Sequence, residues 1–404
     1  MHFLFAWRYF RGKYAFQAIQ IIAWVSVFAI AIGTAALITI LSVSNGFTEV
    51  VKGLYSDFYA DIRVTSSNSK FFKLTDAQYD SLQKIEGVKA LSKVVENKAL
   101  LVKGSRQTVV LLKGVDSTYI HINNVSKYLK RGTFTIGNID HPAIVLGVGV
   151  EQKLALFQEE LGDSLQIYAV NRSGKAFTQL DQLNTLTAVQ AGAFSIQQEF
   201  DEQYVFADAH FAQYLFDIPF DQVSGVELSI QATNEKEIVS KINAIVGPNK
   251  LIQNKYQQNI DLYKIMQMEK WIIFSILALI MIVASFNLIG ALTMLVLEKK
   301  KDIHVLHAMG ATPWSIQKIF LLLSAIMAFI GAFIGGVIAS LFCWIQLQFH
   351  VIKLEGNSFV IDYYPVKPMY TDYVAIIGLI VMISIVAGWI PARRAAAAMH
   401  ERIA

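Results

Sequence analysis

The sequence predicts a membrane protein with four transmembrane α-helices and a large mixed α+β extracytoplasmic domain inserted between spans 1 and 2. The first observation behind this prediction is that 54% of the 404 residues are hydrophobic, which is high for a soluble chain. The second is that four stretches carry no charged residue: 14–48, 271–297, 319–352 and 373–392. Each stretch has about 20 residues or more, enough to cross a hydrocarbon core of about 30 Å as a helix.

The third observation is the placement of basic residues, which predicts the orientation. They cluster before the first stretch, between the second and third, and after the fourth: Arg8, Arg11, Lys13; Lys299, Lys300, Lys301, Lys318; Arg393, Arg394, Arg402. With four spans, all three clusters fall on one side. The positive-inside rule then places both termini in the cytoplasm and the insert on the opposite side of the membrane. The expected membrane is the inner (cytoplasmic) membrane. The net charge of +4 is too small to predict nucleic-acid binding.

These patterns divide the chain into nine expected segments. The segments are a cytoplasmic interfacial helix (1–18), transmembrane helix 1 (19–44), the extracytoplasmic α+β domain (45–259), a stalk with transmembrane helix 2 (260–297), a cytoplasmic coupling helix (298–318), transmembrane helix 3 (319–347), an extracytoplasmic loop (348–372), transmembrane helix 4 (373–392) and a cytoplasmic tail (393–404). No Gly or Pro interrupts 260–270, so the stalk is expected to continue into the second span.

The insert mixes strand and helix signals. Thr75 to Gln78 is a capping box that predicts a helix start, and Gly104-Ser105 between two apolar runs predicts a hairpin. Strands are expected at 61–65, 99–102, 108–112, 143–146, 164–170, 188–196, 223–230 and 250–254, and helices at 148–156, 205–216 and 234–246. The single cysteine, Cys343, lies in the third apolar stretch, so the insert is expected to rely on an ordinary core.

Chemical motifs are scarce. Gly12-Lys13 and Gly174-Lys175 lack the Ser or Thr and the earlier Gly of a phosphate-binding loop. ATP, if used, is therefore expected on another chain, and no cofactor on this one. His304 and His307 have no evident further metal ligand nearby, and a helix-face role is favoured over a metal site.

The apolar stretches hold few polar residues. Asn287 is the main exception; an interhelical hydrogen bond is favoured over contact with a polar headgroup. Small residues recur in the third stretch at helical spacing, as Ala29 and Gly33 do in the first: Ala328, Gly331, Ala332, Gly335, Gly336 and Ser340. This repeat predicts close helix packing.

The connection between the second and third stretches is expected to form a short helix over Asp302 to Met309. Gly310 suits the position after a helix C-terminus, and Pro313 suits the first turn of the next helix. Docking of this basic connector onto a cytoplasmic partner is favoured over a plain connection.

Seven short runs recur in one known family: A-W-R-Y at 6–9, L-S-V-S-N-G-F at 41–47, A-I-V-L-G at 143–147, L-G-D at 161–163, K-K-D-I at 300–303, M-G-A at 309–311 and P-A-R-R-A at 391–395. With these runs the chain resembles the permeases of type VII ABC transporters, the MacB-like and FtsX-like group, and within it the lipoprotein-releasing (LolC/LolE-type) permeases. The C-terminus departs from the group's D-P-x-x-x-L ending.

The resemblance implies a permease subunit, not an enzyme, that extracts lipoproteins from the outer leaflet and passes them to a periplasmic carrier. It implies a separate ABC ATPase subunit that binds ATP, a second permease copy or paralogue, a lipoprotein cargo, and membrane lipids around the spans. The implied ATPase-coupling residues are Asp302, Ile303, Leu306, Met309, Gly310 and Ala311. The loop 171–184 takes the place of the carrier-binding loop, which suggests Asn171, Arg172, Phe177 and Gln179 as carrier contacts, although its sequence is not closely similar.

The cargo path is expected near Asn45, Gly46 and Phe47, with Asn287 as a further candidate. An Asn-Gly pair can adopt positive φ and break the helix where the first span leaves the leaflet. Phe47 would then meet an acyl chain; the alternative is a helix C-cap with Phe47 as a buried staple. Two other functions remain open: a MacB-like efflux permease, and an FtsX-like activator of a cell-wall hydrolase.

Overall fold

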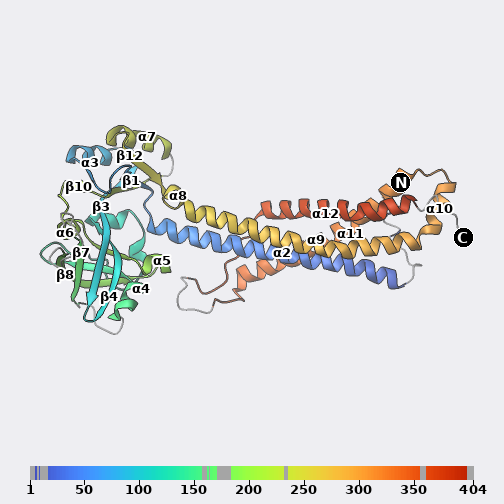
Figure 1. The fold of residues 1–404 in the computed structure, drawn as a ribbon, viewed down its shortest axis with the longest axis horizontal. Coiled ribbons are helices and arrows are strands. Elements are labelled where there is room, and N and C mark those ends of the chain that lie inside the picture. The colour runs from blue at the N-terminus through green and yellow to red at the C-terminus, as the bar shows by residue number, and fades with distance from the viewer. Residues whose placement is uncertain are drawn as a thin grey trace. The chain divides into compact units, whose positions relative to one another are not determined.

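The computed structural model describes residues 5–6, 9, 17–156, 162, 164–170, 183–231, 235–354 and 361–397. The chain forms two compact units. We call unit 1 the membrane unit; it comprises residues 1–50, 264–354 and 361–404. We call unit 2 the α+β domain; it comprises residues 51–263 and 355–360. Figure 1 labels the elements of each unit.

Four helices are long and apolar enough to cross a membrane, as the sequence predicts. They are α2 (Gln17–Phe58), α9 (Ile260–Glu298), α11 (Pro313–Phe349) and α12 (Tyr370–Ala397). The short helix α10 (Lys300–Ala308) joins α9 to α11. We call this side of the bundle the connector end, and the side from which α2 enters the α+β domain the domain end. Helix α9 is uninterrupted from Ile260, as predicted for the stalk.

Glycines bring α2 against two neighbours in the membrane unit. A Cβ atom on Gly33 would lie 2.3 Å from Sδ of Met281 on α9. On α11, a Cβ on Gly335 would lie 2.3 Å from the carbonyl oxygen of Ala31, and one on Gly331 would lie 2.8 Å from that of Val27. A side chain at Gly331 or Gly335 would meet the backbone of α2 and separate the helices, so these small residues do serve helix packing as predicted. At Gly33 only the flexible Met281 side chain would have to move. Helix α2 therefore packs between α9 and α11.

The α+β domain is built on one large sheet and a small one (Figure 1). The large sheet has the order β12-β1-β11-β3-β4-β9-β6-β8-β5, and β7 pairs with both β3 and β8. The strands of the large sheet are β1 (Ile62–Ser66), β3 (Val88–Lys103), β4 (Arg106–Val115), β5 (Leu129–Gly132), β6 (Ala143–Gly147), β7 (Ser164–Val170), β8 (Leu183–Phe194), β9 (Tyr204–Asp208), β11 (Gly225–Ile230) and β12 (Lys250–Asn254). Strands β2 (Phe72–Lys73) and β10 (Gln222–Val223) form the small one.

The long strand β3 divides the domain into two parts. Its first half pairs with β11, and its second half pairs with β4 and β7. The pairings β3–β4, β4–β9, β9–β6, β6–β8, β8–β7 and β7–β3 form a closed ring of strands. Within the ring each of these six strands is paired on both sides, whereas β12 and β5 end the strand order outside it.

Helices complete both parts of the domain. Helix α3 (Asp76–Gln83) begins with the predicted capping box, in which the Thr75 side chain accepts a hydrogen bond from the Gln78 amide. It packs with α7 (Glu235–Val246) on the β1–β11–β12 part, where Leu82 and Ile242 are fully buried. The remaining short helices are α4 (Val148–Leu154), α5 (Gln198–Asp201), α6 (Ala209–Leu215), α8 (Lys255–Gln258) and the 3₁₀ helices η1 (Ser117–His121) and η2 (Val125–Tyr128).

One secondary-structure prediction in this domain is partly wrong. Residues 205–216 were expected to form one helix, but 204–208 form strand β9 and the helix α6 covers only 209–215. The apolar run Val205 to Ala207 is buried within the ring between β4 and β6. Asp208 marks the change, since its side chain accepts hydrogen bonds from the amides of His210 and Phe211 and caps α6. A short apolar run before a helix cannot be distinguished from helix by periodicity alone.

The last residues of α2 lie in an aromatic core of the α+β domain. Phe58 is fully buried, and its ring stacks on Phe200 with centroids 3.9 Å apart and an interplanar angle of 7°. Tyr59 and Tyr204 meet the Phe58 ring edge-on. Aromatic rings bury much apolar surface and stabilise one another beyond that burial. This core fixes the end of α2 to the strand ring.

Candidate functional site

Three polar side chains from three different spans meet at the domain end of the membrane unit. Nζ of Lys270 on α9 lies 2.8 Å from Oδ1 of Asp372 on α12 and 3.0 Å from Oδ1 of Asn45 on α2. Nδ2 of Asn45 donates to Oδ2 of Asp372 at 2.5 Å. Asn45 and Asp372 are buried, and Lys270 is partly exposed. We call these three residues the polar cluster; it joins α2, α9 and α12.

Gly46 lies beside the polar cluster and is packed against a neighbouring segment. A Cβ atom there would lie 2.3 Å from the carbonyl oxygen of Pro365 and 2.7 Å from the amide nitrogen of Val366. The same segment is held to α2 by a hydrogen bond from the amide of Lys367 to the carbonyl oxygen of Ser42, at 2.8 Å. Gly46 therefore permits close approach of the segment that precedes α12.

The predicted helix break at Asn45-Gly46 is wrong. Helix α2 is continuous from Gln17 to Phe58, and neither Asn45 nor Gly46 has positive φ. The first span therefore continues as helix past residue 44, where the sequence division ended it. Both residues have other tasks, because Asn45 binds Lys270 and Asp372 and Gly46 leaves room for Pro365. The partners Lys270, Asp372 and Pro365 lie far along the chain, so the local sequence does not predict these contacts.

Phe47, the next residue of α2, is half-buried. Its ring meets that of Tyr364 edge-on, with centroids 5.7 Å apart. This contact favours the alternative in which Phe47 holds neighbouring structure in place, although part of the ring stays accessible. A role in the cargo path remains a prediction.

Asn287 lies on the exposed side of α9. Among the described residues no hydrogen bond of its side chain is found, and only its backbone carbonyl accepts one, from Oγ of Ser26 at 3.1 Å. The interhelical side-chain bond expected for Asn287 is therefore not made within the described part of the chain. A polar side chain facing hydrocarbon is unfavourable, so a partner outside this chain would stabilise it.

The connector end carries the predicted coupling residues. Ile303 is fully buried, Asp302 and Met309 are exposed, and Met309 has 79% of its surface accessible. Gly310 has φ +89°, and Pro313 is the first residue of α11, as the sequence predicts. Thr312 caps this helix. The remaining coupling residues, Leu306, Gly310 and Ala311, border with Met309 a hollow of about 280 Å³. The connector thus presents an apolar side chain above a small hollow.

An ion pair is fully buried in the α+β domain. Nζ of Lys113 on β4 lies 2.8 and 3.0 Å from the two carboxylate oxygens of Glu227 on β11. Burial by itself raises the pKa of Glu227, but Lys113 and Arg63 together hold this pKa below its ordinary value. Arg63 also bonds Glu96 at 2.9 Å. Burial raises the pKa of the neighbouring Tyr119 well above its ordinary value, so it stays neutral.

Two other predictions concern the carrier contacts and a metal site. The proposed carrier contacts Asn171, Arg172, Phe177 and Gln179 lie outside the described residues. Among the residues that the structure describes, no group of three or more His, Cys, Asp or Glu is placed to hold a metal ion. His304 and His307 lie on α10.

Sequence reasoning missed four residues of these clusters, yet each carries a signal. Lys270 and Asp372 are the charges that bound the second and fourth apolar stretches, and were used only as limits of spans. Lys113 is the one charge in the stretch 109–115 of β4, and Glu227 is the one charge of β11. A lone charge in a buried strand needs a partner, and this rule could have paired them.

Comparison with known proteins defines the class. Residues 23–245 match the MacB-like periplasmic core domain family, and residues 274–398 match the FtsX-like permease C-terminal family. The chain therefore belongs to the MacB/FtsX-like family of ABC transporter permeases.

Two relatives are similar to this chain over nearly its whole length. The chain is 26% identical to the lipoprotein-releasing system transmembrane protein LolC of Neisseria meningitidis serogroup B, over 98% of this chain and 97% of that protein. It is 24% identical to the corresponding LolE of Haemophilus influenzae, over 98% and 96%. Among solved structures, the periplasmic region of MacB from Actinobacillus actinomycetemcomitans is 12% identical, covers 53% of this chain and 98% of its own, and gives a TM-score of 0.38.

Proposed function

We propose that this chain is the permease subunit of an ABC transporter that extracts lipoproteins from the outer leaflet of the inner membrane and passes them to a periplasmic carrier. The observation that carries the proposal is similarity along nearly the whole chain to transmembrane proteins of lipoprotein-releasing systems. Similarity confined to one part would support only the shared family.

The energetics of the task suit the composition of the spans. Burying one CH₂ group is worth about 0.8 kcal/mol, so removing two or three acyl chains from a bilayer requires an external energy source and an apolar receiving surface. Within the uncharged stretches, most exposed side chains of α2, α9, α11 and α12 are apolar. ATP binds to a separate subunit in this proposal, because the sequence carries no phosphate-binding loop.

The connector is the proposed docking site of that ATPase. Met309 is the most exposed apolar residue of the connector, and its neighbours Gly310 and Ala311 leave a hollow beside it. A partner can bury Met309 and fill this hollow. The three basic clusters lie in the connector and next to the two termini. The positive-inside rule assigns the side with such clusters to the cytoplasm, so we place the connector and both termini there.

A second permease copy or paralogue is the proposed partner of α9. Asn287 faces outward there without a described side-chain partner, and Gly290 on the same helix has no atom within 4 Å of a Cβ. A second subunit can approach closely at Gly290 and bond Asn287. The surface between the subunits, with Phe47 at its domain end, is the proposed cargo path. Asn45 and Gly46 hold α2 against α9, α12 and the segment before α12 instead of contacting the cargo.

A reconstituted release assay tests the function. The chain would be copurified with its ATPase, placed in vesicles with a triacylated lipoprotein, and supplied with ATP and a soluble carrier. We expect ATP-dependent appearance of the lipoprotein in the soluble fraction, and none with a non-hydrolysable analogue. ATP-dependent export of small molecules without lipoprotein release would support an efflux permease instead.

A further inference from the structure

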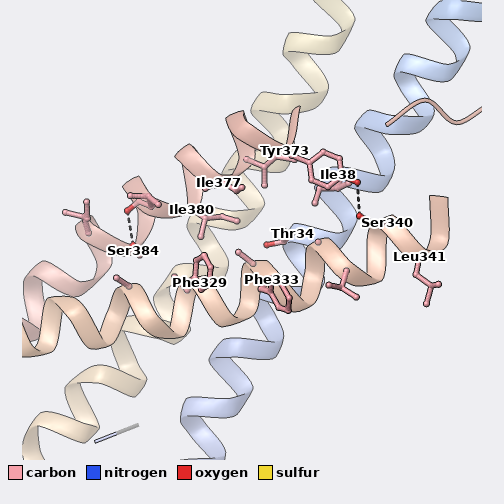
Figure 2. A pocket seen from close by; sticks show the side chains of 18 of the residues that line it. Thr34, Ile38, Phe329, Phe333, Ser340, Leu341, Tyr373, Ile377, Ile380 and Ser384 are labelled. Atoms are coloured by element: carbon pink, nitrogen blue, oxygen red, sulfur yellow. Dashed lines mark hydrogen bonds between the residues drawn. The ribbon is translucent and has the colours of Figure 1, made fainter. Parts of the chain in front are cut away.

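A deep groove opens between α11 and α12 on the side of the bundle away from α9. Its volume is about 900 Å³, within the range of about 300–1,000 Å³ typical of ligand sites. Figure 2 shows Thr34 and Ile38 of α2 at its floor, with Phe329 and Phe333 from α11 and Ile377 from α12 along its sides. Thr34 and Ile38 are almost fully buried, so the groove reaches past the two outer helices to the third.

The small residues of α11 explain the groove, because they divide between two faces of the helix. Gly331 and Gly335 touch the backbone of α2. Ala332 and Gly336 line the groove, where a Cβ on Gly336 would meet only Cδ1 of Ile38, at 3.9 Å. The first pair brings helices together, as the sequence predicts. The second pair leaves space that no described side chain fills.

Both ends of the groove are defined by contacts between α11 and α12. Toward the connector end the helices touch, since a Cβ on Gly388 would lie 2.7 Å from Cβ of Ser324. At the domain end the hydroxyls of Ser340 and Tyr373 are hydrogen-bonded at 3.0 Å (Figure 2). From Tyr373 to Ile385, which lines the other end, a helix rises about 18 Å at 1.5 Å per residue. This slightly exceeds half of a hydrocarbon core of about 30 Å.

We propose that this groove binds one acyl chain of a bilayer phospholipid from the leaflet at the domain end. The groove is continuous with the lipid-facing surface of α11 and α12, whose Phe333 and Ile377 are exposed. A transmembrane helix, about 10–12 Å across with its side chains, is too wide to reach Thr34 between them. Water gains too few hydrogen bonds in an apolar hollow to occupy it.

The polar end of the groove matches the polar end of such a lipid. Ser340 and Tyr373 share one hydrogen bond, so one of their two hydroxyl protons remains free to donate. An ester carbonyl at the top of an acyl chain is an acceptor without a proton of its own. The hydroxyl pair is exposed and lies at the domain end, so it can bond this ester while the chain extends toward Ser384.

Photolabelling of the full-length protein tests the site. The protein would be placed in vesicles of phosphatidylethanolamine and phosphatidylglycerol containing a trace of phosphatidylcholine with a diazirine in its acyl chain. We expect labelling concentrated in peptides containing 328–340 and 376–384, and loss of most of it in Gly336→Leu. Gly378→Leu is the matched control, since Gly378 is exposed on α12 outside the groove with no atom within 4 Å of a Cβ.

A second measurement guards against misfolding of the variant. Native mass spectrometry of detergent-purified protein should show one fewer retained phospholipid per chain in Gly336→Leu than in Gly378→Leu, at equal thermal stability. Equal labelling of both variants, or labelling spread evenly over all spans, would overturn the proposal. Displacement of the phospholipid by a triacylated peptide would also overturn the proposal, because it would assign the groove to cargo. Disulfide cross-linking between two copies that carry Phe333→Cys would overturn it as well, because a second copy would then cover the groove.

Discussion

Gly46 on α2 lies so close to Pro365 that a Cβ atom would approach the Pro365 carbonyl oxygen to 2.3 Å. This contact holds the segment before α12 against α2 at the domain end of the membrane unit. The segment and the polar cluster of Asn45, Lys270 and Asp372 lie next to one another, so packing and ion pairing fix the same region.

Gly46→Ala should therefore destabilise the protein. In an unobstructed helix, replacing Gly by Ala stabilises by about 1 kcal/mol, but overpacking costs about 1–3 kcal/mol. We expect a lower thermal unfolding temperature for Gly46→Ala in detergent. Gly53→Ala on the same helix is the control, because no atom lies within 4 Å of a Cβ there, and it should be neutral or stabilising. Stabilisation by both variants would show that the contact at Pro365 yields without cost.

Lys113→Met should be strongly destabilising, because it leaves the Glu227 carboxylate buried and short of its principal partner. Loss of one member of a buried pair costs about 3–5 kcal/mol. The double variant Lys113→Met/Glu227→Leu should recover much of this loss, since Arg63 keeps Glu96 as its partner. Chemical unfolding of both variants measures the difference. A double variant less stable than Lys113→Met would show that the pair itself, and not the unpaired charge, dominates.

The same pair predicts a pH dependence. The pKa of Glu227 lies below its ordinary value of 4.5 in the folded protein, so its contribution to stability is complete above that pH. The contribution is lost as the pH falls through 4.5 toward the folded pKa. Unfolding temperatures measured from about pH 6 to about pH 3 should fall more steeply in the wild type than in the double variant. Asp201, whose pKa is raised by burial, has the opposite effect but is present in both proteins. Parallel curves would contradict the assignment.

Met309→Arg should abolish copurification of the ATPase while the permease still inserts. The Met309 side chain is exposed, so arginine is tolerated by the fold, but a partner that buries it would have to bury a charge. Met309→Leu, which keeps an apolar side chain of similar size, should retain the complex. Pull-down and ATPase activity are the measurements. A Met309→Arg complex with normal activity would reduce the connector to a plain link.

A photo-crosslinking residue at Phe47 should trap a triacylated lipoprotein but not its unlipidated form. The half-buried ring has an accessible side, and Phe47 lies near the end of the uncharged stretch 14–48, two residues before Glu49. The matched control is a crosslinker at Phe349, which is exposed at the domain end of α11 and outside the proposed path. Equal trapping at the two positions would mean that Phe47 meets only the surrounding bilayer.

The orientation is tested by cysteine labelling in intact cells on a Cys343→Ala background. A cysteine at Asp140 in the α+β domain should react with an impermeant reagent, and one at Lys301 on α10 should react only after the membrane is opened. Both positions are exposed, so failure to react reports on the side of the membrane and not on burial. Labelling of Lys301 in intact cells would reverse the proposed topology.

Local sequence features were sufficient to predict the four spans, the stalk, the connector with Gly310 and Pro313, and most strands of the insert. These features depend on local quantities: the length of an uncharged run against the bilayer thickness, the capping residues, and the alternation of apolar residues. The division of residues 204–215 between β9 and α6 was decided by pairing with β4 and β6.

The contacts between residues far apart in the chain could not be predicted in this way and depend on how the helices pack. Asn45 was expected to break a helix, and it instead joins Lys270 and Asp372, which lie 225 and 327 positions away. Small residues on one helix serve packing at Gly335 and leave a groove at Gly336, although both belong to the same repeat. A periodic pattern predicts that one face of a helix carries small side chains. Whether another helix packs against each of these positions depends on segments elsewhere in the chain.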